Sequence, residues 1–305
     1  MKIISSAPGK LMLFGEHVVV YGYPCLVTAV DKRMFVTIEE VKKKEDEIIA
    51  PQVKECHFLK EAIDLFKKKY SYNKSIRITT RGDFSHQVGL GSSSAITVAT
   101  FSALSNICNV SLSKKELFDL SYQITLKIQG VGSGFDIAAA VYGGTLSFLA
   151  GGKKIEPMNL KKLPLIIGYS GIKADTPEIV KSLKLKVQSE KPKYFRFFGE
   201  IKKIVKKAEK ELVLEKWKEV GILMNENQQL LQQLGVSTER LNRMCQAAVL
   251  AGAYGAKLSG AGGGDCMIVL TPHEKIEPVE KILKEVGGEV IRADVNAQGV
   301  RTEKI

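Results

Sequence analysis

The chain has 305 residues, of which 45% are hydrophobic, and it carries a formal net charge of +12 at pH 7. This composition excludes a globally disordered chain and allows a substantial core in one large domain or two closely packed lobes. The excess of positive charge is densest from Lys181 to Lys218, where lysines alternate with apolar residues at helical spacing. Such a pattern is typical of solvated helix faces, with a surface for nucleic acid or anionic membrane as the alternative.

The five cysteines are widely separated, and none of them falls in a paired metal-ligand spacing. No segment approaches roughly 18 uninterrupted apolar residues, and the N-terminus has no leader-like apolar core. We therefore expect a soluble, unexported protein in a reducing cytoplasm. Without zinc-finger spacing or an aromatic RNA-binding signature, we expect neither nucleic acid nor membrane as a partner.

The first third of the chain predicts a sheet followed by helices. Residues 2–40 are apolar and β-branched between prolines and glycines, which predicts strands, and residues 54–70 have helical periodicity. A strand is expected at 75–80, and a helix is expected to end near Cys108. Ser113 and Glu116 form a capping-box pattern at the start of a further helix, which we expect to reach about Lys127.

The remaining elements alternate between strands and helices. Strands are expected at 145–149, 165–169 and 266–270 and near Val290 and Val300, and helices are expected through most of 176–251 and at 273–286. The chain shows neither an internal repeat nor a long linker. The pattern predicts an α+β fold of two intimately joined lobes, which we place at residues 1–165 and 166–305.

A loop of small residues runs directly into an apolar helix. It consists of Gly89, Leu90, Gly91, Ser92, Ser93 and Ser94. Backbone N–H groups and the positive end of a helix dipole can converge there on a phosphate, while serine hydroxyls can donate to phosphate or ligate magnesium. A surface loop with an N-cap serine explains the same residues equally well. The loop is not a Walker A sequence, because no Gly-Lys-Ser/Thr follows the glycines.

A second glycine-rich segment, Gly260, Ala261, Gly262, Gly263 and Gly264, precedes an expected strand. Clustered glycines are conformationally costly unless the backbone needs them. They indicate either a turn with positive φ angles or a backbone wall against a ligand.

Asp136 follows a glycine turn, and Lys10 lies in an early Ala-Pro-Gly-Lys sequence. An aspartate after such a turn is commonly an Asx-turn or a helix cap, and a lysine is commonly a surface residue. As a catalytic pair, the aspartate would accept the proton of a substrate hydroxyl, and the lysine would attract the transferring phosphoryl group.

In this order, the three segments resemble the superfamily of galactokinase, homoserine kinase, mevalonate kinase and phosphomevalonate kinase over nearly the whole chain. The opening from Ala7 to Gly22 and the stretches 223–238 and 255–257 are most similar to the mevalonate kinase branch. The resemblance implies a two-lobed small-molecule kinase fold with the active site in the cleft between the lobes. It also implies ATP-dependent phosphorylation of the 5-hydroxyl of mevalonate in isoprenoid biosynthesis, with Mg²⁺ as cofactor and a homodimer as the family-level expectation.

The resemblance also implies roles for individual residues. Asp136 and Lys10 match the catalytic base and its partner, and Gly89 to Ser94 match the ATP-binding loop, with Ser93 as the magnesium ligand. The residues implied at the acceptor site are Glu16, His17, Thr176, Gly260, Ala261, Gly262 and Gly263. The segment from Gly260 to Gly263 is also implied to close the wall around the phosphates.

Two features depart from the pattern. Thr125 stands where mevalonate kinases commonly carry a metal-site glutamate, and the segments 132–140 and 264–266 are more similar to phosphomevalonate kinase. Phosphomevalonate kinase and a non-catalytic nucleotide-binding relative therefore stay as alternatives.

Overall fold

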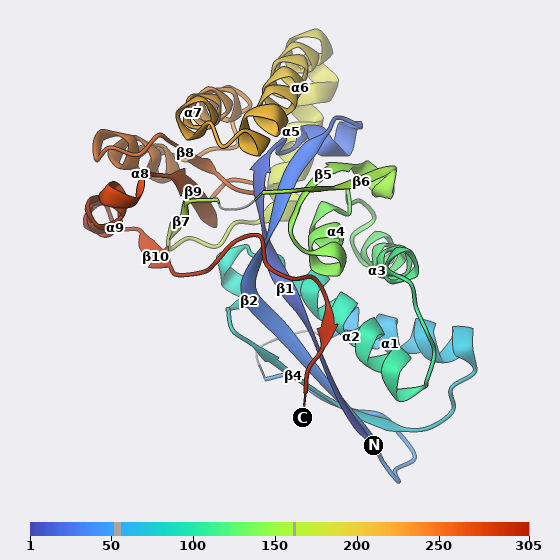
Figure 1. Ribbon diagram of the computed structural model, residues 1–305. Coiled ribbons are helices and arrows are strands. Elements are labelled where there is room, and N and C mark those ends of the chain that lie inside the picture. The colour runs from blue at the N-terminus through green and yellow to red at the C-terminus, as the bar shows by residue number, and fades with distance from the viewer. Residues whose placement is uncertain (52–55, 161–162, 305) are drawn as a thin grey trace.

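The structure is a computed structural model that describes residues 1–51, 56–160 and 163–304. These residues form a seven-stranded sheet and a four-stranded sheet, each accompanied by helices (Figure 1). The α+β architecture expected from the sequence is confirmed. In this described part of the chain, no helix is both long and apolar enough to cross a membrane.

The larger sheet is built around a long antiparallel pair of strands. Its path is β11-β1-β2-β4-β3, with β5 paired to β2 and β6 paired to β5. The strands are β1 (Lys2–Phe14), β2 (Cys25–Glu40), β3 (Glu47–Ile49), β4 (Ile76–Gly82), β5 (Thr145–Leu149), β6 (Lys154–Met158) and β11 (Arg301–Thr302).

The register between β1 and β2 shifts between Pro8 and Gly9. Proline has no N–H to give to the ladder, so a bulge is a position that tolerates it. A Cβ on Gly9 would lie 2.9 Å from the carbonyl oxygen of Leu90, and the next residue, Lys10, donates its backbone N–H to the same oxygen at 2.9 Å. The absence of a side chain at Gly9 therefore lets the loop before α2 pack directly on β1.

Four helices lie on one side of this sheet (Figure 1): α1 (His57–Tyr70), α2 (Ser92–Ile107), α3 (Lys114–Gln129) and α4 (Phe135–Tyr142). Every residue of α2 from Ser94 to Ser105 is buried, because sheet and helices enclose it. The expected capping box is present at Ser113 and Glu116. The helix expected from residue 54 is described from His57 onward, and the expected start at 54 lies outside the described residues.

The smaller sheet has the order β10-β7-β9-β8 and is antiparallel throughout. Its strands are β7 (Leu165–Tyr169), β8 (Gly255–Leu258), β9 (Cys266–Leu270) and β10 (Glu289–Ile291). The helices of this half are α5 (Thr176–Ser189), α6 (Lys191–Val213), α7 (Trp217–Gln233), α8 (Glu239–Leu250) and α9 (Ile276–Glu285). The predicted lobe boundary between residues 165 and 166 stays a prediction.

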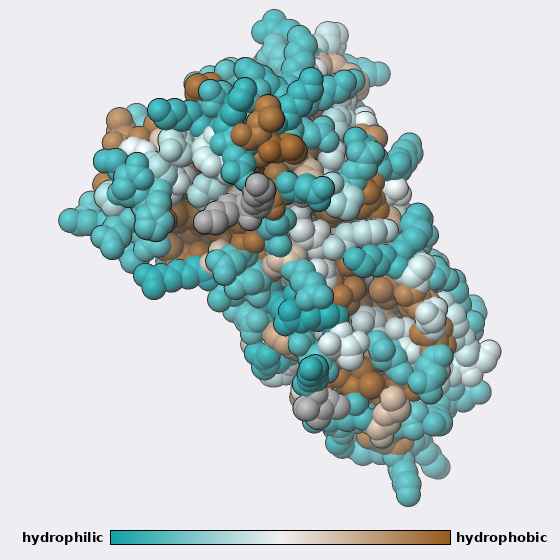
Figure 2. Space-filling model, viewed as in Figure 1, coloured by the Kyte–Doolittle hydropathy of each residue, from teal (hydrophilic) through white to brown (hydrophobic). Residues whose placement is uncertain are grey.

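The lysine-rich stretch forms α5, α6 and the start of α7. Phe198, Ile201 and Val205 of α6 are buried, and the ring of Phe198 lies 4.7 Å from that of Tyr21. Lysines cover the opposite face, and Figure 2 shows mainly hydrophilic residues over this part of the molecule, at the top of the view. This is the arrangement of a solvated amphipathic helix.

The last residues return to the larger sheet. Val295 bridges to Val30, Gln298 bridges to Gly143, and β11 pairs with β1. Arg33 is buried and donates to the carbonyl oxygens of Gln298 and Gly299, each at 2.8 Å. The C-terminal segment is therefore part of the N-terminal sheet.

Candidate active site

The segment Gly89 to Ser94 forms a tight loop that becomes the first turn of α2. Gly89 and Gly91 have φ angles of 74° and 79°, a region that glycine adopts without strain. Gly91 is the N-cap residue, so the serines that follow supply N–H groups that have no acceptor within the helix. These N–H groups and the helix dipole favour an anion at this end of α2.

Lys10 lies beside this loop. It is buried, and its Nζ donates to the carbonyl oxygen of Gly89 at 2.9 Å. The ammonium also lies 5.5 Å from the ring centroid of Phe135, at the start of α4. Burial lowers the pKa of Lys10, and the negative charge of Asp136 partly offsets this effect. The lysine therefore joins the glycine loop to the helix that carries Asp136.

Asp136 is in the first turn of α4, directly opposite the start of α2. Its Oδ2 accepts a hydrogen bond from the Ser94 hydroxyl, and its Oδ1 accepts from the Ile137 N–H at 3.1 Å. Asp136, Lys10 and the loop from Gly89 to Ser94 are thus brought together from distant parts of the sequence.

Neighbouring serines of the loop differ in their surroundings. Ser94 is buried, whereas Ser93 is exposed. The hydroxyl that reaches Asp136 therefore comes from Ser94, and the expected metal contact of Ser93 stays a prediction.

Glu16 forms a buried ion pair with Lys257 of β8. Both side chains are completely buried, and Lys257 also donates to the Leu258 carbonyl oxygen at 2.6 Å. Burial is the main cause of a raised pKa for Glu16 and a lowered pKa for Lys257, while their mutual attraction opposes both shifts. The pair links the turn after β1 to the smaller sheet.

His17 extends the same connection. Its φ angle is 61°, and its Nε2 lies 2.8 Å from the carbonyl oxygen of Ala261. A neutral imidazole with its proton on Nε2 donates this bond. Burial lowers the pKa of His17 to about 4, so the ring is neutral at physiological pH. The predicted acceptor residues Glu16, His17 and Ala261 therefore lie in one region.

Protonation of His17 should make the fold sensitive to acid. The imidazole takes up a proton near pH 6.5 in the unfolded chain and near pH 4 in the folded chain. The contribution of neutral His17 to the unfolding free energy is therefore complete above pH 6.5 and is lost as pH falls toward 4. Between pH 7 and pH 4.5 this residue should account for about 2–3 kcal/mol of lost unfolding free energy. Urea unfolding of the wild type and His17→Asn at both pH values measures the difference, since asparagine tolerates positive φ. An equal loss in both proteins would contradict the assignment.

The second glycine segment is shaped largely by packing. A Cβ on Gly262 would lie 2.0 Å from the Val236 carbonyl oxygen, and one on Gly263 would lie 2.3 Å from Ile179. Gly260 faces the site, because a Cβ there would lie 3.8 Å from Lys10 Nζ. Gly260, Gly262 and Gly263 also have φ angles of 103°, 77° and 70°, so a turn with positive φ angles accounts for all three glycines.

Asp265 lies in the segment 264–266, and the sequence pattern gave it no role in the site. It is buried with a φ angle of 55°, and its Oδ1 accepts from the Ala174 N–H at 3.0 Å and lies 3.3 Å from Lys173 Nζ. A Cβ on Gly89 would lie 2.6 Å from the Asp265 side chain. Asp265 directly follows a run of glycines, and aspartate tolerates positive φ angles. This position was the sequence signal that could have indicated its role in the turn. Asp265 braces the glycine loop against the turn before α5.

Cys266 continues this contact, since its thiol lies 2.9 Å from the Val88 carbonyl oxygen. Burial raises the pKa of the Cys266 thiol to about 12, so the sulfur stays protonated. The residue therefore acts as a packing group beneath the loop.

Thr176 and Thr125 lie at the borders of the site. Thr176 is exposed at the start of α5, three residues after Lys173, and its expected substrate contact stays a prediction. Thr125 is buried, and its hydroxyl donates to the Ser121 carbonyl oxygen of its own helix at 3.3 Å.

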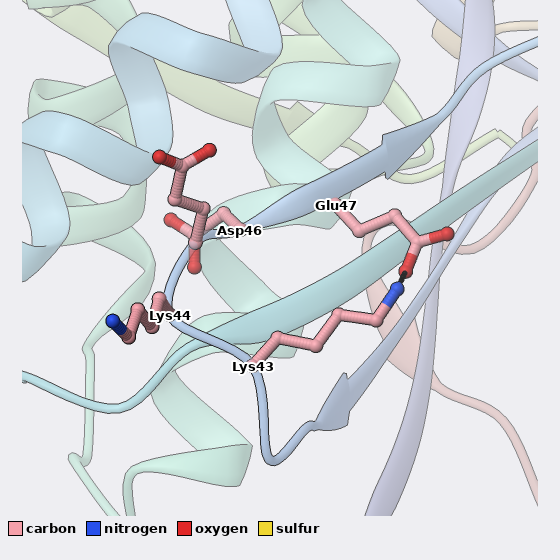
Figure 3. Close-up of a pocket in the computed structure, with 5 residues that line it drawn as sticks. Lys43, Lys44, Asp46 and Glu47 are labelled. Carbon is pink, nitrogen blue, oxygen red and sulfur yellow. Dashed lines mark hydrogen bonds and ion pairs between the residues drawn. The ribbon is translucent and has the colours of Figure 1, made fainter.

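A surface hollow of about 390 Å³ lies elsewhere, at residues 43–47 (Figure 3). Three of its five lining residues are in ion pairs, Lys43 with Glu47 and Asp46 with Lys67. The hollow lies next to the end of β2 that pairs with Lys2 of β1. Lys2 is eight residues from Lys10, which corresponds to about 25 Å along an extended strand. We therefore do not assign a site to this hollow.

Comparison with known proteins agrees with the geometry. The model of the GHMP kinases N terminal domain matches residues 57–144, and the model of the GHMP kinases C terminal region matches residues 204–289. A protein of Pyrococcus furiosus named mevalonate kinase is 34% identical, with 100% of this chain and 99% of the relative covered. The chain belongs to the GHMP kinase family. It is an ATP-dependent kinase.

Solved structures of this family share the fold. The Methanococcus jannaschii mevalonate kinase has a TM-score of 0.83 and 27% identity, with 96% of this chain and 98% of that chain covered. The L. major mevalonate kinase in complex with R-mevalonate has a TM-score of 0.82 and 25% identity, with 96% of each chain covered. A galactokinase galactose-binding signature also matches residues 1–40 of this GHMP kinase.

Proposed function

We propose that this GHMP kinase transfers the terminal phosphate of ATP to the 5-hydroxyl of mevalonate, giving 5-phosphomevalonate in isoprenoid biosynthesis. The observation that carries the proposal is that Lys10 and Asp136 both lie at the start of α2, Lys10 bonded to the Gly89 carbonyl oxygen and Asp136 to the Ser94 hydroxyl. The full-length similarity to proteins named mevalonate kinase supports the choice of acceptor.

In the proposed mechanism, the β- and γ-phosphates of ATP lie on the backbone from Gly89 to Ser94. Asp136 accepts the proton of the acceptor hydroxyl while the hydroxyl oxygen attacks the γ-phosphorus in line with the departing ADP. Lys10 lies where its ammonium would attract the transferring phosphoryl group. Most of the rate then comes from positioning and from neutralisation of charge.

We propose Mg²⁺ as the cofactor of this site. Magnesium is commonly held by one or two carboxylates together with substrate phosphates and water. Asp136 supplies a carboxylate beside the first turn of α2, and the exposed hydroxyl of Ser93 in that turn is the second proposed ligand. The described residues contain no cluster of three or more acidic, histidine or cysteine ligands. When bound, Mg²⁺ would neutralise charge on the β- and γ-phosphates.

The acceptor would be enclosed by His17, Thr176 and the segment from Gly260 to Gly263. Glu16, also implied at the acceptor site, would support it from behind, because its carboxylate is completely buried against Lys257. Two other acceptors have observations in their favour. The segments 132–140 and 264–266 favour 5-phosphomevalonate, and the signature at residues 1–40 favours galactose.

Turnover with each acceptor tests the proposal directly. A coupled assay for ADP release with Mg²⁺-ATP, offering mevalonate, 5-phosphomevalonate and galactose separately, should show turnover with mevalonate alone. Turnover only with 5-phosphomevalonate or only with galactose would replace the acceptor. No ADP release with any of the three would favour a non-catalytic nucleotide-binding relative. Calorimetry would then show whether the protein still binds ATP.

The glycine loop allows a matched test of ATP binding. Gly89→Ala combines a positive φ with a Cβ that would meet Asp265 at 2.6 Å, whereas Gly130→Ala has a φ of 70° and no atom within 4 Å. Both variants should lose about 1 kcal/mol from backbone strain. Only Gly89→Ala should raise the KM for ATP, by roughly tenfold or more, because the loop must shift away from Asp265. Steady-state kinetics and thermal unfolding of both variants check this, and equal KM values would contradict it.

We further propose a cytoplasmic location and a homodimer. The five cysteines are all free thiols, which fits a reducing compartment. Light scattering on the purified protein would measure the oligomeric state.

A further inference from the structure

We propose that Ser94 is a positioning residue for the chemical step, whose hydroxyl fixes the orientation of the Asp136 carboxylate. This inference rests on the proposed function, because it takes Asp136 as the proton acceptor. It separates Ser94 from the other loop residues, whose proposed task is to bind ATP.

The two side chains meet because of where two helices begin. Ser94 is the third residue of α2 after the Gly91 N-cap, and Asp136 is the second residue of α4 after the Gly134 N-cap. Successive residues of a helix point about 100° apart. The Ser93 side chain is therefore exposed, while the Ser94 side chain is turned inward to Asp136.

The carboxylate of Asp136 is held at both oxygens. Ser94 donates to Oδ2, and the Ile137 N–H donates to Oδ1 at 3.1 Å. The terminal torsion of an aspartate is intrinsically broad, so two donors on opposite oxygens are needed to fix the plane of the group. An ionised carboxylate accepts about four hydrogen bonds, so each oxygen keeps capacity for an acceptor hydroxyl.

Ser94 is only 4% exposed, whereas Asp136 is partly accessible. Without the Ser94 hydroxyl, the carboxylate would keep the Ile137 N–H and could rotate toward water. Misplacement of a reacting group by about 1 Å can cost 10²-fold in rate. Loss of this hydroxyl should therefore reduce kcat, and it should leave ATP binding nearly unchanged.

The test is a double-mutant cycle between Ser94→Ala and Asp136→Asn, measured with the acceptor that the wild type turns over. Ser94→Ala alone should lower kcat roughly tenfold or more, with the KM for ATP within about twofold of wild type. In the Asp136→Asn background the same change should alter kcat by less than about twofold, because the group that it positions is gone. Ser94→Thr, which keeps a hydroxyl, should recover most of the rate.

Ser105→Ala is the matched control. Ser105 is a buried serine of the same helix, and its hydroxyl donates to the Ser102 carbonyl oxygen at 2.8 Å. It should leave both kinetic constants unchanged, and thermal unfolding of all variants reports any loss of fold.

Two kinetic outcomes would overturn the inference. A raised KM for ATP with an unchanged kcat would make Ser94 a phosphate-binding residue, and equal effects in both backgrounds would make its role structural. A crystal structure of Ser94→Ala with the Asp136 carboxylate unmoved would overturn it without any activity measurement. Failure of the proposed function is separate, because it would appear in the wild type as turnover with another acceptor or none.

Discussion

Asp136→Asn should lower kcat by about 10²–10⁴, the range expected when a positioned general base is removed. Asparagine has nearly the same shape, so the Ile137 N–H and the Ser94 hydroxyl can still be accommodated. The KM for ATP should change little, because the phosphates are proposed to lie on the backbone at the start of α2. Steady-state kinetics at saturating mevalonate with ATP varied measure both constants.

A second substitution of aspartate by asparagine, away from the site, controls for the loss of one negative charge. Asp119→Asn removes a carboxylate on the exposed face of α3, where it pairs with Lys115. This variant should keep the wild-type kcat. If Asp136→Asn also kept it in a correctly folded protein, Asp136 would have no part in proton transfer, and the proposed mechanism would need another base.

Lys257→Met should destabilise the protein by about 3–5 kcal/mol, because it leaves the Glu16 carboxylate buried without its partner. Both groups are completely buried, and the second oxygen of Glu16 already has no hydrogen-bond partner among the described residues. Water cannot reach the stranded charge, so its desolvation would be uncompensated. Urea unfolding at neutral pH measures the difference in unfolding free energy.

Two further variants define the origin of this loss. Glu16→Gln combined with Lys257→Met removes both charges and should recover much of the stability. Lys115→Met breaks an exposed ion pair and should change stability little. A loss in Lys257→Met no larger than in Lys115→Met would mean that the buried pair is not coupled to folding.

Local signals in the sequence predicted the parts of the site that are built locally. The glycine-serine run before an apolar helix predicted the loop at the start of α2, and the Ser113 and Glu116 spacing predicted a capping box that is present. These features depend on residues within a few positions of one another. The α+β fold and the family were also predicted correctly, because three motifs occur in one order along the chain.

The contacts that were missed depend on residues far apart in sequence. Glu16 and Lys257 are separated by 241 positions, and nothing near either residue indicates its partner. Lys257 lies in β8, a four-residue strand opened by Gly255, which is too short to show a clear alternation. Asp265 looked like the end of a glycine turn, and only the folded chain shows that it abuts Gly89.

Residues 294–303 return to the larger sheet, so this sheet can be completed only after the rest of the chain has been synthesised. Arg33 is buried against carbonyl oxygens of Gln298 and Gly299, so its charge lacks these partners until the C-terminal segment has left the ribosome. Domains generally fold in sequence as they emerge, but the N-terminal sheet of this kinase cannot be completed in that way. Its last strand arrives after the whole second sheet has been translated, so the nascent N-terminal half exposes an open β1 edge for most of translation.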